Sequence, residues 1–418
     1  MSDLPIAPLQ GMSDICAPEV FLWQQVEDAA RRVFDRYGFT EVRTPVIERL
    51  EVFVRSIGEQ TDVVKKEMYA FEDRGGRRIA LRPEGTAGVI RYLAGAGPAA
   101  ADARVYYIGP MFRSERPQAG RKRQFHQIGV EALGAPSPAA DAECIALQMD
   151  VLREIGLEGG ALRVNTRGDA GDQEAVARSV RDALATRRGE LCADCVRRID
   201  GNALRVLDCK QAGCRAVVQT LPPVASAMSA ESRAYLADVL RLLRRLNIDV
   251  IEDAMLVRGL DYYRHTIWEI THPALGAQDS IAGGGRYGIQ LGNRIHEGVG
   301  FAMGIERLVM ALEASGAAAA DSMAPRRVWI VSAGDTVREE NLVLAQTLRA
   351  HGIPCSLDLA GRSVKAQMRA ANRANARRVV VRGEAEMERG VFLLKDMQDG
   401  SQDELALPEL IERLLRPA

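Results

Sequence analysis

The sequence predicts an α+β core that is interrupted by a helical insertion and followed by a small α/β domain. Short stretches with strand character are separated by helices and loops over the first part of the chain. From about residue 172 to 246 the pattern is helical and charged, and after Pro325 strands and helices alternate regularly. Because 418 residues exceed what one hydrophobic core normally holds, we expect domains at 1–320 and 326–418, with the insertion inside the first.

The first elements follow from apolar spacing and from glycine or proline boundaries. Apolar side chains at helical spacing over 19–37 predict an amphipathic helix that ends at Gly38. A strand over 39–45 ends at Pro45, which cannot donate a hydrogen bond to a sheet and therefore suits an edge. A second helix begins near Gly85. Further strands of the core are expected at 78–82, 104–109, 124–131, 249–256, 266–271 and 280–282.

The end of the core and the last domain are also marked in the sequence. A helix opens near Met303, and the alanine-rich stretch 314–322 predicts a linker. The last domain should then contain a largely parallel sheet, because its strands are separated by helices. Its expected elements are a strand at 328–332, a helix to about 350, a strand at 353–357, a helix at 364–374 and a strand at 378–382.

The composition indicates a globular protein of a reducing compartment. Hydrophobic residues make up 47% and charged residues 27%, and no stretch approaches the roughly 18 apolar residues that a membrane helix needs. The N-terminus carries an early acid and no basic flank before an apolar segment, so we expect no targeting peptide, no membrane contact and a cytoplasmic location. The odd number of cysteines, seven, fits free thiols. With a net charge of -1, contact with nucleic acid would require local basic patches.

The segment from Arg113 to Glu131 is the densest in polar side chains. Its first part is a loop with Pro117 and Gly120 that carries the basic residues Arg113, Arg116, Arg121, Lys122 and Arg123. Several guanidinium groups in one loop could converge on a polyphosphate with bidentate geometry. A solvated hairpin with a charged tip is the alternative interpretation.

The second part of this segment alternates as a strand. Phe125, Gln127, Gly129 and Glu131 share one face, whereas Gln124, His126, Ile128 and Val130 share the other. An aromatic ring, an amide, a glycine and a carboxylate make a poor apolar core. They could instead form the floor of a site for adenine and a small polar ligand.

Five sequence blocks in order resemble class II aminoacyl-tRNA synthetases of the histidyl branch. Phe112-Arg113-x-Glu115-Arg116, with Arg-Gln-Phe-His-Gln after it, resembles the second signature motif of that class. Gly300 to Leu308 resembles the third motif, a glycine-rich strand before a helix with an arginine. Three further blocks resemble segments of the histidyl branch: Arg82-Pro83-Glu84-Gly85-Thr86, Arg258-Gly259-Leu260-Asp261-Tyr262-Tyr263 and Gly283-Gly284-Gly285-Arg286-Tyr287. The resemblance covers nearly the whole chain and implies an antiparallel catalytic sheet with an anticodon-binding domain after it.

The resemblance also implies roles for individual residues. Those implied to bind ATP are Arg113, Glu115, Arg121, Phe125 and Arg307. Those implied to bind histidine are Glu84, Gly85, Thr86, Arg113, Gln127, Glu131, Arg258, Tyr262 and Tyr263. Arg113 and Arg258 are implied to be catalytic. Taken without the resemblance, the two tyrosines could equally be packing aromatics, and Glu84 could be an ordinary carboxylate at a helix N-terminus.

The activity that the resemblance implies is ligation of L-histidine to its tRNA. ATP and Mg²⁺ would convert histidine to histidyl-adenylate and pyrophosphate, and a ribose hydroxyl at the 3′ end of the tRNA would then take the histidine and release AMP. The family is usually homodimeric. A relative with the same fold but another function is the histidine-sensing regulatory subunit of ATP phosphoribosyltransferase. Such regulators tend to lack the anticodon domain and the ATP-contacting arginines that this chain has.

Two departures from the family pattern lie beside the implied pocket. Gly288 follows Tyr287 where an aspartate is usual, and Arg264-His265 differs from the commoner pair. Both put the rim of the pocket in doubt without removing an assigned residue.

The insertion contains four cysteines in two close pairs. Cys192 and Cys195 are separated by two residues, and Cys209 and Cys214 by four. Two thiol pairs joined by a short loop suit tetrahedral zinc, but the second spacing is looser than usual. Reduced thiols without metal are the alternative interpretation.

A basic stripe in the last domain suggests contact with tRNA. Arg362, Lys365, Arg369 and Arg373 recur at three- and four-residue steps, and Arg377, Arg378 and Arg382 follow. A solvated helix face is the usual explanation of such a stripe, but the resemblance places an anticodon-binding domain here. It also implies that the loop with Arg116 and Gln118 reads the acceptor end of the tRNA.

Overall fold

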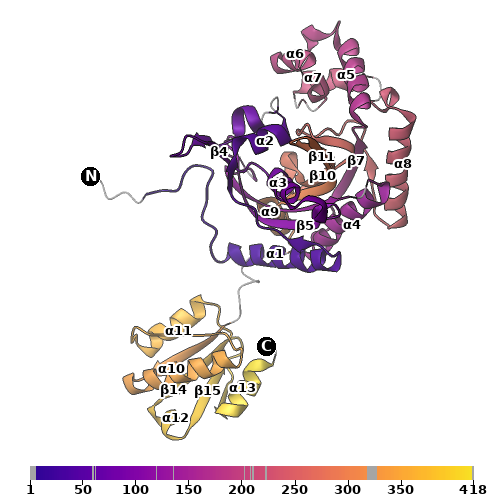
Figure 1. Cartoon of the computed structure of the whole chain (residues 1–418). Coiled ribbons are helices and arrows are strands. Elements are labelled where there is room, and N and C mark those ends of the chain that lie inside the picture. The colour runs from indigo at the N-terminus through magenta and orange to yellow at the C-terminus, as the bar shows by residue number, and fades with distance from the viewer. Residues whose placement is uncertain are drawn as a thin grey trace. The chain divides into compact units, whose positions relative to one another are not determined.

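The chain forms two compact units, Met1–Met323 and Ala324–Ala418 (Figure 1). The computed structural model describes residues 6–58, 61, 63–118, 120–134, 136–201, 203–207, 209, 211–221, 224–317 and 327–416. Residues 318–322 of the expected linker therefore lie outside the described part of the chain. Among the described residues, no helix combines the length and the apolar character needed to cross a membrane.

An eight-stranded sheet forms the centre of the first unit. Its strand order is β1-β5-β6-β11-β10-β9-β7-β8. Every neighbouring pair from β5 to β7 is antiparallel, and only the two-residue end strands pair in parallel, which confirms the predicted antiparallel core. The strands are β1 (Thr40–Glu41), β5 (Arg104–Phe112), β6 (Gln124–Leu133), β7 (Ala161–Thr166), β8 (Ile251–Glu252), β9 (Tyr263–Thr271), β10 (Ser280–Leu291) and β11 (Arg294–Gly304).

One large apolar core joins this sheet to four helices: α1 (Glu19–Arg36), α4 (Pro138–Glu154), α8 (Ala230–Arg245) and α9 (Ile305–Ala314). In α1 the buried side chains recur every three or four residues, from Leu22 to Phe34, so one stripe of the helix faces the core. Trp268 of β9 lies fully buried in the same cluster and donates its indole N–H to Gln148 of α4 at 2.6 Å.

A second cluster contains α3 (Thr86–Ala96) and several tyrosines of the sheet. Beside it, the chain between β1 and β5 forms a three-stranded sheet in the order β2-β4-β3. Its elements are β2 (Ile47–Arg49), α2 (Leu50–Ile57), β3 (Ala70–Glu72) and β4 (Arg78–Leu81). This small sheet leads directly into the Arg82 to Thr86 block, and it thereby fixes Glu84 at the start of α3.

The insertion has its own small core of short helices. Its helices are α5 (Ala170–Leu184), α6 (Ala193–Asp200) and α7 (Ala212–Val218), with 3₁₀ turns at Arg188–Glu190, Ala203–Val206 and Val224–Ala227. Its apolar cluster runs only from Val176 to Met228. Helix α8, which we expected inside the insertion, packs instead on α4 in the main core through Leu236, Val239 and Leu243. The charged pattern of α8 hid this buried stripe.

Several strand predictions were wrong in extent. The strand expected at 249–256 contains only the two residues of β8, and the one at 39–45 only those of β1. Strand β7 was not predicted, and of β11 only its end was expected, as the glycine-rich strand that begins at Gly300. Strand β10 continues through the glycine-rich block to Leu291. Glycine has low intrinsic strand propensity, so this block did not look like a strand. Pairing with β9 and β11 on both sides overrides that preference.

The second unit is a five-stranded sheet in the order β13-β12-β14-β15-β16. β13 (Cys355–Leu357), β12 (Val328–Ala333) and β14 (Arg378–Gly383) are parallel, as predicted. β15 (Val391–Asp396) and β16 (Gln402–Ala406) are antiparallel and were not predicted. The helices are α10 (Asp335–Ala350), α11 (Val364–Arg373), α12 (Glu384–Glu388) and α13 (Leu407–Leu415).

Candidate active site

Two adjoining cavities lie over strands β6, β10 and β11. The inner cavity has a volume of about 70 Å³, and the outer cavity about 560 Å³. The inner cavity is lined by Glu84, Thr86, Tyr107, Arg113, Gln127, Glu131, Arg258, Leu260, Tyr262, Tyr263, Gly283, Tyr287, Gly300, Phe301 and Ala302. The lining of the outer cavity includes Arg113, Glu115, Arg121, Lys122, Phe125, Arg205, Arg258, Glu269, Asp279 and Arg307.

The structure brings together the predicted site residues from distant parts of the chain. Every residue that the sequence assigned to histidine lines the inner cavity, except Gly85. Every residue assigned to ATP lines the outer cavity. Gly85 contributes through its lack of a side chain, because a Cβ at this position would overlap the ring of Tyr107. It therefore lets Tyr107 lie against the start of α3.

The alternation predicted for β6 positions the floor of both cavities. Phe125, Gln127 and Glu131 point into them, whereas Ile128 and Val130 are buried in the main core. His126, on the core side, lies near Glu306 of α9, and its backbone N–H donates to that carboxylate at 3.0 Å. One strand thus separates a polar site from an apolar core.

Glu131 is the most deeply buried titratable side chain of the inner cavity. Its side chain is 1% exposed, and burial raises the pKa of its carboxyl to about 8. Among the described residues, neither Oε2 of Glu131 nor Oε1 of Gln127 has a hydrogen-bond partner. Buried acceptors of this kind normally have a donor, so the cavity fits a ligand that brings N–H groups.

Glu84 combines a structural bond with a place in the cavity wall. Its carboxylate accepts hydrogen bonds from the backbone N–H groups of Thr86 at 2.7 Å and Ala87 at 2.8 Å, at the first turn of α3. Burial nevertheless raises the pKa of this carboxyl. The helix-terminus interpretation and the ligand-binding interpretation are therefore compatible.

Arg113 and Arg258 line both cavities and mark their junction. Arg113 donates from Nε to the carbonyl oxygen of Pro83 at 2.9 Å, and its guanidinium lies 5.3 Å from the ring centroid of Phe125. Arg258 pairs with Glu269 at 3.2 Å. A group that enters from either cavity meets a guanidinium at this point.

The outer cavity concentrates positive charge. Arg307 is held by the carbonyl oxygen of Gly120 at 3.1 Å, and burial together with the nearby Arg121 lowers the pKa of Arg307. Arg121 in turn pairs with Glu115 at 3.2 Å. Two guanidinium groups that lie close together repel each other, and an anionic ligand between them removes this repulsion.

Sequence reasoning missed many residues of the cavities, among them two tyrosines, a glutamate and an arginine. Tyr107 and Tyr287 line the inner cavity, whereas Glu269 and Arg205 line the outer one. Tyr287 belongs to the block from Gly283 to Tyr287 that resembles the histidyl branch, so it could have been assigned from that block. Nothing in the local pattern pointed to Arg205, because it comes from the insertion.

The two departures from the family pattern contact each other. A Cβ at position 288 would lie 2.8 Å from Nε of Arg264, so the arginine side chain occupies the space that Gly288 leaves. Arg264 also approaches Glu297 at 3.7 Å. His265 stacks on Tyr235 of α8 at 4.9 Å between ring centroids. Arg264 and Gly288, one residue from each departure, therefore lie in direct contact.

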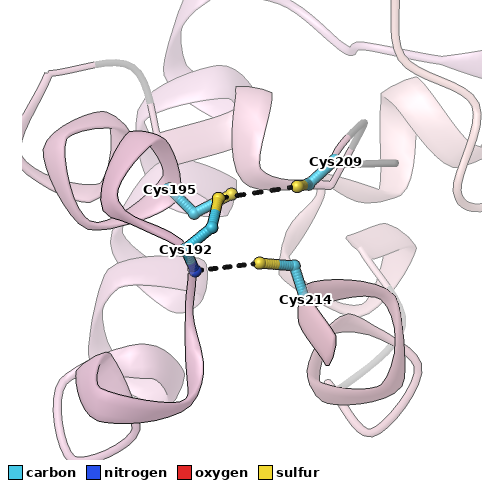
Figure 2. A group of neighbouring side chains, drawn as sticks. All are labelled: Cys192, Cys195, Cys209 and Cys214. Carbon is cyan, nitrogen blue, oxygen red and sulfur yellow. Dashed lines mark hydrogen bonds between the residues drawn. The ribbon is translucent and has the colours of Figure 1, made fainter. Parts of the chain in front are cut away.

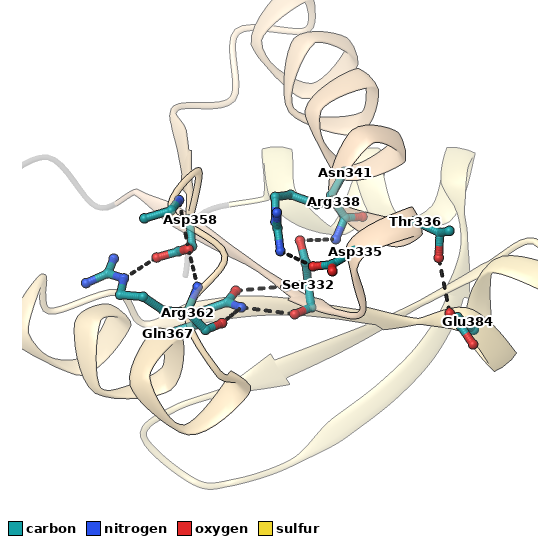
Figure 3. Close-up of polar contacts among 10 residues, drawn as sticks. Ser332, Asp335, Thr336, Arg338, Asn341, Asp358, Arg362, Gln367 and Glu384 are labelled. Carbon is teal, nitrogen blue, oxygen red and sulfur yellow. Dashed lines mark hydrogen bonds and ion pairs between the residues drawn. The ribbon is translucent and has the colours of Figure 1, made fainter.

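The basic residues assigned to tRNA are partly engaged by acids. In the second unit Arg362 pairs with the buried Asp358 (Figure 3). Gln367, on the buried side of α11, bonds both backbone groups of Ser332. Lys365, Arg369 and Arg373 are exposed at four-residue steps.

The arginines that follow this helix are also engaged. Arg377 pairs with Asp396 at 3.4 Å, and Arg382 lies over the ring of Phe392. The stripe is therefore shorter than the sequence suggested. In the first unit Arg116 and Gln118 are exposed on the loop before β6.

An antiparallel sheet with an arginine-rich cavity beside a small polar one, followed by an α/β unit, has the features that the resemblance to class II aminoacyl-tRNA synthetases implied. The comparisons with known proteins narrow this class. The family model described as histidyl-tRNA synthetase matches residues 11–308, and the anticodon binding domain model matches residues 327–416. The chain belongs to the histidyl-tRNA synthetase family.

Relatives match over nearly the whole chain. A histidine–tRNA ligase of Halothermothrix orenii is 43% identical over 97% of this chain and 98% of its own length. One of Anaeromyxobacter dehalogenans is 44% identical over 98% of this chain and all of its own length. The solved structure of apo histidyl-tRNA synthetase from S. aureus matches with a TM-score of 0.80 and 32% identity, over 98% of this chain and 100% of that one.

Proposed function

We propose where histidine and ATP bind in this chain, and which residues act when the two substrates are joined. The enzyme activates L-histidine with ATP to histidyl-adenylate and pyrophosphate, and it then transfers the histidine to the 3′ end of its tRNA with release of AMP. Histidine occupies the inner cavity, and ATP occupies the outer one. The observation that carries this assignment is the arrangement of two arginines, Arg113 and Arg258, at the point where the cavities meet.

The inner cavity suits histidine because its wall offers acceptors at both ends of the ligand. Glu131, beside Tyr262 and Tyr263, takes the imidazole N–H groups, and the amide oxygen of Gln127 takes the ammonium together with Glu84. Support comes from two buried oxygen atoms, Oε2 of Glu131 and Oε1 of Gln127, for which no hydrogen bond is found among the described residues. A site built around such donors rejects isosteres that lack them.

The outer cavity suits a nucleotide triphosphate. Arg121 and Arg307 neutralise the outer phosphates, Arg113 holds the α-phosphate, and Phe125 offers an aromatic face to adenine. Mg²⁺ needs oxygen ligands, and the carboxylates of Glu115 and Glu269 in this cavity fit it. When bound, the ion neutralises phosphate charge. The arginines and Glu115 orient the nucleotide.

The reaction follows from the charges that move at the junction. The histidine carboxylate attacks the α-phosphorus, the bond to pyrophosphate breaks, and negative charge gathers on the equatorial oxygens. Arg113 and Arg258 lie where that charge develops, so they stabilise the transition state more than the separate substrates. The chemistry requires no protein nucleophile.

The alternative is a histidine-sensing regulatory subunit without ligase activity. Two features count against it: the second unit matches the anticodon binding domain model, and the arginines expected at the ATP site line one cavity. Histidine-dependent exchange of labelled pyrophosphate into ATP separates the two functions. We expect exchange with histidine and background with the other amino acids. If pure, folded protein gives no exchange with histidine, the proposal is refuted.

The partners follow from the same assignment. We place the tRNA acceptor end near Arg116 and Gln118, and the anticodon arm near Lys365, Arg369 and Arg373, with Arg362 at the end of that stripe. The exposed positions of these side chains support this placement; Arg362 is exposed as well, but it is already paired with Asp358. We further propose that the enzyme acts as a homodimer in the cytoplasm, as is usual for the class.

A further inference from the structure

The insertion brings four cysteines into one cluster. Cys192 is the residue before α6 and Cys195 lies in the first turn of that helix, whereas Cys209 follows a 3₁₀ turn and Cys214 lies in α7 (Figure 2). Their four sulfur atoms lie within 4.8 Å of one another. Three short elements therefore converge on one point through thiols alone.

The spacing of the sulfurs fits a metal better than a disulfide. The Sγ atoms of Cys192 and Cys209 are 3.9 Å apart, against about 2.05 Å in a disulfide. A tetrahedral zinc ion with Zn–S bonds of about 2.3 Å has S–S edges of about 3.8 Å. The backbone N–H of Cys192 donates to Sγ of Cys214 at 3.2 Å, and such bonds stabilise thiolate ligands of metals.

The position of the cluster connects it to the active site. The chain between the two cysteine pairs carries Arg205, which lines the outer cavity. Cys195, Cys209 and Cys214 belong to the small core of the insertion, and Val257, the neighbour of Arg258, packs against that core. The cluster thus holds together the piece of the insertion that contributes Arg205 to the outer cavity.

We propose that Cys192, Cys195, Cys209 and Cys214 bind one zinc ion, and that this ion positions Arg205 in the wall of the outer cavity. Short helices around a small core gain stability from such a cross-link. The role of the ion in positioning Arg205 rests on the proposed binding of ATP in the outer cavity. Zinc binding by the four cysteines does not rest on that assignment.

The first test is the metal content of the full chain purified without chelator. We expect about one equivalent of zinc per chain in the wild type and less than about a tenth in Cys192→Ser and Cys209→Ser variants. Cys355→Ser is the matched control, because Cys355 is also buried but lies in the second unit. Zinc below about a tenth of an equivalent in the wild type, or iron in its place, would overturn the metal site.

The second test separates the ion from Arg205. In pyrophosphate exchange, Arg205→Ala should retain zinc and raise the KM for ATP by about tenfold, the loss of one charged hydrogen bond. Cys209→Ser should raise this KM by a similar factor, with a smaller effect on the KM for histidine. The variant that carries both Arg205→Ala and Cys209→Ser should then have a KM for ATP close to that of either single variant. Additive effects, or an unchanged KM for ATP in Cys209→Ser, would overturn the positioning role even if zinc is bound.

Discussion

Replacing Glu131 with glutamine should stabilise the protein at alkaline pH and weaken histidine activation. Burial raises the pKa of the Glu131 carboxyl from 4.5 to about 8. The unfolded chain releases this proton near pH 4.5, whereas the folded chain keeps it to about pH 8. The free energy of unfolding of the wild type therefore falls as pH rises between these values. Glutamine does not titrate, so the free energy of unfolding of the variant does not fall with pH for this reason.

The magnitudes of the stability effect and of the loss of histidine activation can both be worked out from the Glu131 carboxyl. At 1.36 kcal/mol per pKa unit, the difference between 4.5 and about 8 amounts to on the order of 5 kcal/mol at pH 8, and to less than about 1 kcal/mol at pH 5. The bound imidazole favours the ionised form of Glu131, and loss of this charged hydrogen-bond acceptor costs about 1.5–3 kcal/mol in binding the imidazole. The kcat/KM for histidine in pyrophosphate exchange should fall about 10- to 150-fold.

Thermal unfolding of the wild type and of Glu131→Gln between pH 5 and 9 measures the stability effect. The midpoint difference in favour of the variant should grow with pH and level off above about pH 8. Glu313→Gln, which changes an exposed carboxylate, is the control and should show no such growth. A difference that does not vary with pH, or a wild type that is more stable at pH 8, would refute the role of the buried carboxyl.

Three further substitutions test other parts of the account. Gly300→Ala places a Cβ 2.3 Å from both Oε2 of Glu131 and the backbone oxygen of Val130, so β11 must shift. The thermal midpoint should fall, and steady-state exchange should show a raised KM for histidine with a smaller change for ATP; equal changes in the two KM values would contradict the separation of the cavities. Arg307→Ala should raise the KM for ATP by about tenfold, and an unchanged value would remove Arg307 from the phosphate site. Neutralising Lys365, Arg369 and Arg373 together should weaken tRNA binding and reduce the slope of log K against log salt by about two, and an unchanged slope would show that α11 does not contact the phosphate backbone.

The fold class was predictable from the sequence, and the residues that the sequence placed in a site lie together in the structure, whereas the bounds of several strands differ from the prediction. Arginines and carboxylates such as Arg113 and Glu131 stand in ordered blocks, and these blocks lie where the strands of the large sheet bring them together. Helix α1 and the alternation of β6 were also predictable, because burial on one face leaves a regular period in the sequence.

The remaining features depend on tertiary contacts that leave no local signal. The glycines of β10 have low strand propensity, and only its pairing with β9 and β11 makes this segment a strand. The membership of α8 in the main core depends on α4, which is far away in the sequence. Arg205 joins the outer cavity because the insertion folds back on Val257. No window of neighbouring residues contains this information.

Single-turnover formation of histidyl-adenylate tests the central claim, that the two substrates meet between Arg113 and Arg258. Excess enzyme is mixed with histidine and α-labelled ATP, and the adenylate is counted at each time. Arg258→Ala should still bind both substrates in equilibrium dialysis, but it should form the adenylate about 10²- to 10³-fold more slowly than the wild type. Adenylate formation at the wild-type rate in this variant would contradict the account.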